Sequence, residues 1–194
     1  LFTFLISFPL ALSAQSAEDV LQKVSVAMTA EQWEQAVSLF RQAIQLNADK
    51  SEMFYWTSVD KASSVGTKMA QELAFHYKTM RNYDKAYLFC KEVLQKNPND
   101  VKWLAACAET EVCRGKEKDA LLTYQKVLSL DVNHLAANIF VGNYYYLMAE
   151  QEKQQLMRDY KKISSPTRMQ YARYKDGLSK LMTDGYGKAK EYLQ

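Results

Sequence analysis

The chain has 194 residues, of which 48% are hydrophobic and 24% are charged, proportions that are ordinary for a globular protein. Its 3 prolines and 6 glycines are too few for the many tight turns of a β-sandwich or barrel, and they favour long helices. The formal net charge of +3 is too small to indicate a nucleic-acid-binding protein, which needs a strongly basic surface.

Residues 1–15 carry no charge, and charge begins only at Glu18 and Asp19. An apolar run that ends in small residues is typical of a secretory signal peptide, whereas a membrane span needs roughly 20 apolar residues. We therefore expect residues 1–15 to be a signal peptide remnant, with cleavage within residues 11–17. The mature protein would be exported, periplasmic or secreted, and would not span a membrane. A buried N-terminal helix is the alternative, which Pro9 and the missing polar face disfavour.

A first helix pair is expected over residues 17–50, where Trp33 and Ala36-x3-Phe40 lie in the second helix. Residues 51–66 are an insertion between this helix pair and the next one. Because they contain the apolar run Met53-Phe54-Tyr55-Trp56, we expect an extra apolar turn or short helix there.

Self-similarity appears from residue 67 onward with a period of 34 residues. Ala74, Ala108 and Gly142 are separated by this period, as are Ala86 and Ala120, and Gly177 follows Gly142 after 35 residues. A repeat of this length indicates a stack of supersecondary units in which neighbouring units bury one another's apolar faces.

The stretch Ala70-x2-Leu73-Ala74-x2-Tyr77, followed by Ala86-x3-Cys90 and Pro98, resembles the tetratricopeptide repeat (TPR), whose signature is W-x2-L-G-x2-Y, A-x3-F and P. The resemblance covers nearly all of residues 16–194. It implies an all-α, right-handed α-solenoid of antiparallel helix pairs with about four or five repeats. The repeats lie near 17–50, 67–100, 101–134, 135–168 and 170–194, and the last of them is truncated.

Small side chains at fixed repeat positions allow antiparallel helices to approach to about 8–10 Å. We expect these residues to mark the crossing points of the helices: Ala36, Ala74, Ala86, Ala108, Ala120, Gly142, Gly177 and Ala189.

The repeat pattern weakens toward the C-terminus. Residues 144–163 contain no Gly, Pro or Asn, so the sequence leaves open whether they form one helix or two. Ser165 and Pro166 suit the N-cap and N1 positions of the next helix. A second helix is expected to begin at Tyr186 and to continue beyond Gln194, since a solenoid needs a polar cap.

Neither catalysis nor metal binding is expected. His76 and His134 are the only histidines, and no carboxylate or Cys stands beside either at metal-ligand spacing. Cys90 and Cys107 fall at repeat positions where a thiol serves as a small buried hydrophobe, and Cys113 has no catalytic motif around it. No phosphate-binding, dinucleotide-binding or hydrolase motif occurs, so no cofactor is expected.

The resemblance implies a non-catalytic scaffold or adaptor of the bacterial cell envelope that binds a peptide or protein segment in a concave groove. Residues three and four apart on the first helices share one face. They predict a binding stripe with an apolar centre at Phe75, Val112 and Tyr146. The whole stripe consists of Lys68, Gln71, Phe75, Lys78, Lys102, Glu109, Val112, Asn143 and Tyr146.

Two alternatives remain. The last third is rich in tyrosine and cations, so its rings either stack on sugars of a glycan or envelope polymer, or fill seams between helices. Stacking on nucleic-acid bases is disfavoured, because an exported protein rarely meets RNA. The other alternative is an enzyme whose catalytic domain lies beyond residue 194.

Overall fold

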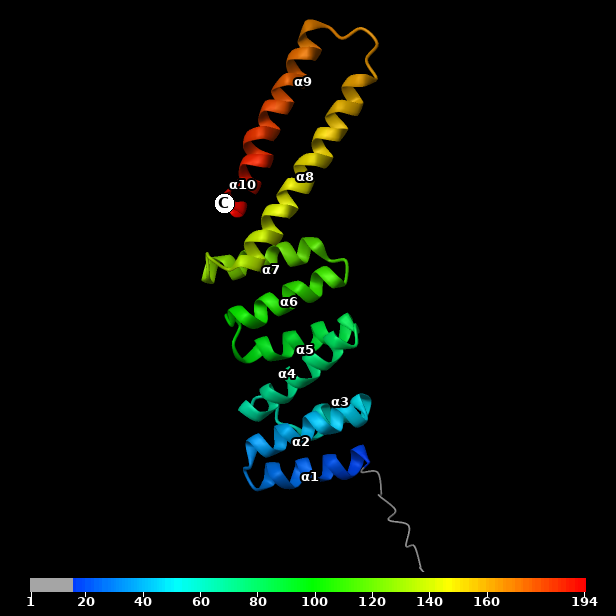
Figure 1. Cartoon of the computed structure of the whole chain (residues 1–194), viewed down its shortest axis with the longest axis vertical. Helices are drawn as coiled ribbons and strands as arrows, with labels where there is room; N and C mark the ends of the chain where they lie inside the picture. The colour runs from blue at the N-terminus through cyan, green and yellow to red at the C-terminus, as the bar shows by residue number, and fades with distance from the viewer. Residues whose placement is uncertain (1–15) are drawn as a thin grey trace, which may run out of the picture. The chain divides into compact units, whose positions relative to one another are not determined.

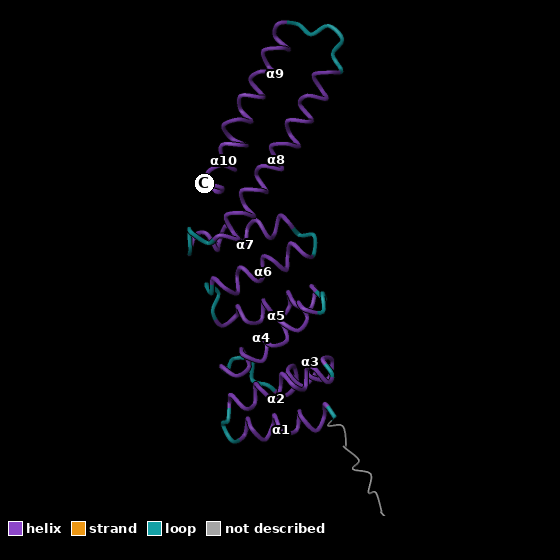
Figure 2. Tube along the Cα trace, in the orientation of Figure 1, coloured by secondary structure: helices purple, strands orange, loops and turns teal. Residues whose placement is uncertain are grey.

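The computed structural model describes residues 16–194, and every regular element in this range is helical (Figure 2). The predicted signal peptide lies outside the described residues. The described residues divide into two units, with the border between His76 and Tyr77, and the units are described separately below. The border falls inside helix α4. No helix in the described range is long and apolar enough to cross a membrane.

The first unit contains α1 (Ala17–Thr29), α2 (Trp33–Leu46), α3 (Ala48–Ser58) and most of α4 (Ser64–Thr79). Helix α1 begins with a capping box, in which the Ser16 hydroxyl accepts from the Asp19 N–H at 3.2 Å and the Asp19 carboxylate accepts from the Ser16 N–H. Ala36 and Phe40 of α2 are fully buried because α1 and α2 pack against each other.

The first half of the inserted segment 51–66 lies in helix α3, which begins before it at Ala48, and residues 64–66 already belong to α4. Helix α3 packs against α1 and α2 (Figure 1). Asn47 caps this helix by accepting from the Lys50 N–H at 2.9 Å. Tyr55 is fully buried, and the Phe54 ring lies 6.2 Å from the Phe40 ring. The expected short apolar helix is therefore present, and it adds to the core of the first unit.

The second unit begins with the end of α4 and continues with α5 (Tyr83–Lys96), α6 (Val101–Cys113), α7 (Glu117–Leu130) and α8 (Leu135–Lys161). Consecutive helices pack as layers (Figure 1). Phe89 is fully buried and stacks on Tyr77 with ring centres 5.8 Å apart. Pro98 lies between α5 and α6, where Asp100 caps α6 by accepting from the Trp103 N–H at 3.0 Å.

The turns inside three helix pairs, α1–α2, α4–α5 and α6–α7, have the same geometry, which identifies a helical repeat independently of the sequence signature. Glu31, Arg81 and Gly115 all have positive φ, between 57° and 70°. Each is followed by an N–H that bonds a carbonyl five residues earlier, at 2.8 Å or 2.9 Å, which is the Schellman arrangement of a helix C-terminus. Arg81 and Gly115 are one period of 34 residues apart. Glu31 precedes Arg81 by that period plus the 16 inserted residues.

The small residues expected at crossing points are buried. Ala36, Ala74, Ala86, Ala108, Ala120 and Ala189 are each at most 3% exposed. Gly142 is also buried, and Gly177 is half-buried.

Residues 135–161 form the single helix α8, so the repeat expected at 135–168 does not close into a helix pair of ordinary length. The following helix, α9 (Arg168–Lys180), is capped by Thr167 and not by Ser165 as expected. Thr167 prevails because Gln170 lies three residues later and completes a capping box, accepting from the Thr167 N–H at 2.8 Å.

The expected turn before Tyr186 is absent. Helix α9 passes into the π-helix η1 (Leu181–Gly187) and then into α10 (Lys188–Leu193), and the junction residues keep right-handed helical dihedrals. The glycines here allow close packing on α8 instead of a turn, because a Cβ on Gly185 would lie 2.8 Å from the Ala149 Cβ. Residues 135–193 therefore form one long hairpin, α8 against α9–η1–α10 (Figure 1).

Candidate functional site

The structure divides the predicted stripe between the two units. In the first unit, Lys68 and Gln71 line a polar cavity of about 320 Å³ between α2 and α4. Glu72 lines it too and accepts two hydrogen bonds of 2.6 Å from the Arg41 guanidinium, which raises the pKa of Arg41. Phe75 is 48% exposed.

In the second unit, two members of the stripe bind each other. Lys78 Nζ lies 2.6 Å from Glu109 Oε2, so these charges are paired within the chain. Tyr146 is 45% exposed, and its ring lies 5.6 Å from the Tyr186 ring. Of the remaining members, Lys102 and Asn143 are exposed and Val112 is half-buried.

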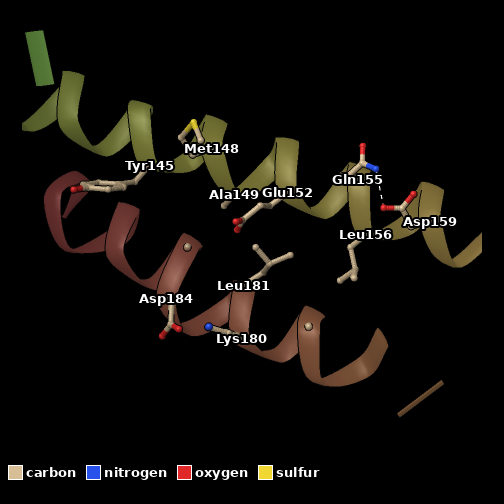
Figure 3. Close-up of a pocket in the computed structure, with 12 residues that line it drawn as sticks. Tyr145, Met148, Ala149, Glu152, Gln155, Leu156, Asp159, Lys180, Leu181 and Asp184 are labelled. Atoms are coloured by element: carbon tan, nitrogen blue, oxygen red, sulfur yellow. Dashed lines mark hydrogen bonds between the residues drawn. The ribbon is translucent and has the colours of Figure 1, made fainter. Parts of the chain in front are cut away.

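A larger hollow lies on a different flank of the long hairpin. It is a groove of about 590 Å³ between the outer half of α8 and the α9–η1 segment. We call it the hairpin groove. Figure 3 shows Leu156 and Leu181 pointing into the space between the helices from opposite sides. The complete lining is Tyr145, Met148, Ala149, Glu152, Gln155, Leu156, Asp159, Gly177, Lys180, Leu181, Asp184 and Gly185.

The rim of the hairpin groove is mainly acidic. Asp159 accepts from Lys162 at 2.9 Å and from Gln155 at 2.7 Å, and these bonds lower its pKa. Glu152 and Asp184 have no ion-pair partner within residues 16–194. Lys180 is the cation of the lining. The groove therefore combines an apolar floor with carboxylates that are available to a ligand.

The face of α8 that lines this groove starts as a buried core face. Ala137 and Val141 are fully buried, and α8 packs against α7. Tyr145, Met148 and Glu152 continue the same row at spacings of three and four. Gln125 of α7 donates to the Tyr145 hydroxyl at 3.0 Å. Beyond Tyr145 the row loses this cover, and no residue from 150 to 180 is buried.

A polar cluster on the opposite flank of the seam fixes η1 to α8. The Tyr186 hydroxyl and Lys153 Nζ both donate to Glu150, the latter at 2.6 Å. Lys153 also lies 5.4 Å from the centre of the Tyr186 ring. Both hydrogen bonds lower the pKa of Glu150, and the bond from Lys153 has the larger effect. This cluster holds η1, which forms one side of the groove, against α8, but its own side chains do not line the groove.

Most tyrosines of the last third contact other aromatic rings in the hairpin. Tyr145 stacks on Tyr192 at 6.0 Å, and Tyr160 stacks on Tyr174 at 4.3 Å. Lys188 lies over the Tyr145 ring at 4.1 Å. These contacts favour the seam-filling interpretation over a row of rings free to stack on sugars.

The thiols and imidazoles do not form a reactive cluster. Burial raises the pKa of Cys90 to about 11 and that of Cys107 to about 12, while Cys113 is exposed. His134 caps α8, its Nδ1 accepting from the Ala137 N–H at 3.3 Å, and burial lowers the pKa of His76. Among residues 16–194 no group of three or more His, Cys, Asp or Glu side chains could hold a metal ion.

Sequence reasoning missed the hairpin groove and one buried carboxyl group. Glu111 is 5% exposed, and its Oε2 has no hydrogen-bond partner. Burial, together with Cys107 and Glu111, raises the pKa of the neighbouring Tyr87. No sequence signal marks Glu111, because its position on a first helix looks like any exposed turn of an amphipathic helix.

The chain is similar in sequence and in fold to a protein of known structure. A Bacteroides ovatus protein, described as a candidate protein-binding protein, is 64% identical over 93% of this chain and 87% of its own, with a TM-score of 0.85. The chain belongs to the family of this protein.

Other solved structures are more distant. MamA is 13% identical over 93% of the chain and 80% of its own, with a TM-score of 0.44. The Caenorhabditis elegans myosin chaperone UNC-45 is 16% identical over 91% of the chain and 19% of its own, with a TM-score of 0.42. No protein-family profile and no curated protein matches the sequence.

Proposed function

We propose that this chain is a non-catalytic scaffold of the tetratricopeptide type that binds a protein segment, and that it acts in the bacterial cell envelope after export. The observation that carries the proposal is the hairpin groove, whose apolar floor continues a row of α8 that is fully buried at Ala137 and Val141 and exposed at Met148. An apolar centre inside a polar rim is the anatomy of a protein-binding hot spot. The description of the Bacteroides ovatus relative supports this class of function.

The expected partner segment is an amphipathic helix. Two helices alone leave their shared apolar face half covered, and a third helix in the groove would complete a three-helix layer. Its apolar side chains would contact Met148, Leu156 and Leu181, and Lys or Arg beside them would meet Glu152 and Asp184.

The predicted stripe is the second candidate surface for the same function. At helical spacing, Tyr146 and Asn143 lie on the flank of α8 opposite Met148 and Glu152, so one variant on each flank separates the two surfaces. The glycan-binding alternative is disfavoured because the stacked tyrosine pairs leave few ring faces open.

The test isolates a partner with the mature chain as bait and measures its affinity for purified variants by calorimetry. Met148→Ser should weaken binding by about 1–2 kcal/mol, the cost of truncating an apolar anchor. Leu122→Ser, at an exposed position on α7, is the matched control and should leave the affinity unchanged. Loss with Tyr146→Ala and not with Met148→Ser would assign the site to the stripe.

A further inference from the structure

A second feature of the long hairpin is the charge of its end. Residues 158–175, which we call the tip, contain six cations and one carboxylate. The tip therefore carries a net charge of +5 in a chain whose formal net charge is +3, and the other residues together are slightly acidic. The six cations are Arg158, Lys161, Lys162, Arg168, Arg173 and Lys175, and all are exposed.

Internal partners neutralise little of this charge. Lys162 pairs with Asp159 at 2.9 Å, and Lys175 lies 5.9 Å from the centre of the Tyr171 ring. Lys161, Arg168 and Arg173 have no ion pair in the described part of the chain. At a rise of 1.5 Å per residue, all six cations lie within about 10 Å of each other along the hairpin axis. They therefore act together at ordinary ionic strength, where the screening length is also about 10 Å.

Apolar side chains are exposed among these cations. Met169 is 67% exposed and Tyr171 is 50% exposed, and Ile163 is half-buried at the turn. Figure 1 shows the turn between α8 and α9 at the far end of the hairpin, away from the α5–α7 layers of the same unit. A convex end that combines cations with exposed Met and Tyr suits the interface of an anionic bilayer.

We propose that the tip docks on an anionic phospholipid surface, with Lys161, Arg168 and Arg173 near the headgroups and Met169 and Tyr171 at the level of the interface. The contact is peripheral, and it leaves most of the hairpin groove accessible because Asp159 is the one groove-lining residue that belongs to the tip. The proposal goes beyond the protein-binding function and does not depend on it.

Two other anionic partners fit the tip less well. An acidic protein segment would bind most tightly in a groove lined by cations, but the groove next to the tip has an acidic rim. A nucleic acid would bind more tightly if its bases could stack on free aromatic rings, but Tyr160 and Tyr174 stack on each other. The test below includes both as outcomes.

The experiment measures co-sedimentation of the complete protein with vesicles of equal parts phosphatidylglycerol and phosphatidylcholine, and with vesicles of phosphatidylcholine alone. We expect binding to the anionic vesicles only, weakened by salt. The triple variant Lys161→Glu, Arg168→Glu, Arg173→Glu should lower the partition coefficient by about 100-fold or more, since each basic residue near such a surface contributes about a factor of five. If circular dichroism shows that the Glu variant does not fold, the same measurement is made with the three residues replaced by Gln.

The matched control is Lys91→Glu, Lys116→Glu, Lys118→Glu, which makes the same change in net charge at exposed positions outside the tip. We expect it to keep most of the vesicle binding. A loss equal to that of the tip variant would show a general charge effect and overturn the proposal. So would unchanged vesicle binding of the double variant Met169→Ser, Tyr171→Ser, or equally tight binding of wild type to polyglutamate or to RNA.

Discussion

Lys78 Nζ lies 2.6 Å from Glu109 Oε2 and joins α4 to α6 within the second unit. Both residues were predicted to face a partner, and the pair shows that their charges are already matched inside the protein. The two side chains are 39% and 52% exposed, so water screens the pair. A double-mutant cycle with Lys78→Met and Glu109→Gln should give a coupling energy below about 1 kcal/mol in chemical denaturation. A larger value would mean that the pair holds α4 on α6.

The stack of Phe89 on Tyr77 is the second prediction. Phe89 is fully buried, so Phe89→Ala should lower the free energy of unfolding by about 3–5 kcal/mol, because it removes a large apolar side chain and leaves a cavity. The neighbouring Leu88 is 44% exposed, and Leu88→Ala is the control, with an expected loss below about 1 kcal/mol. Similar losses for both variants in urea denaturation would contradict the packing described here.

The contact between Gly142 and the end of α10 is the third. A Cβ on Gly142 would lie 2.5 Å from Leu193 Cγ and 3.2 Å from the Ala189 carbonyl oxygen. Gly142→Ala should therefore displace α10 and cost about 1–3 kcal/mol. Leu193→Ala in the same chain should recover part of this loss, since it removes the nearer atoms, whereas an additive double variant would argue against this docking of α10.

The cysteines give the fourth prediction, which is pH-dependent. Burial raises the pKa of Cys90 from 9.0 to about 11, so the unfolded chain loses this proton first. The free energy of unfolding should be unaffected below pH 9 and should fall as the pH rises from about 9 to 11. Cys90→Ala should make this fall less steep but not abolish it, because burial also raises the pKa of Cys107, to about 12.

Thiol labelling at pH 8 provides an independent check. A maleimide should modify the exposed Cys113 rapidly and reach Cys90 and Cys107 only when the chain unfolds. Fast labelling of all three thiols in the folded protein would contradict the burial of Cys90 and Cys107.

The capping box of α1 sharpens the predicted cleavage site, which is the fifth prediction. Ser16 and Asp19 cap each other's backbone N–H, and loss of an N-cap costs about 1 kcal/mol. Processing of the complete precursor should therefore leave Ser16 in the mature protein, with the cut at or before residue 15. N-terminal sequencing of the exported protein measures this, and a mature chain that retains residues 1–10 would refute export by this route.

The sequence by itself determined the helical class, and its period of 34 residues predicted helix pairs up to residue 130 with small residues at their crossings. Periodicity carries this information because each helix pair can bury its apolar face only against its neighbours. The inserted helix α3 was foreseen from Met53 to Trp56 for the same reason, as an apolar run with no other place to be buried. The turns at Glu31 and Arg81 were not visible, because glycine usually marks a positive φ and both positions carry other residues.

Only the tertiary structure decided the C-terminal third. Gly185 and Gly187 look like turn residues in the sequence, but packing on Ala149 of α8 keeps the first of them inside a continuous helical segment. The hairpin groove lies where a row of α8 changes from the buried Ala137 and Val141 to the exposed Met148, and the place of that change depends on how the helices cross. Crossing geometry is set by side chains far apart in the chain, so no local pattern could have located the groove.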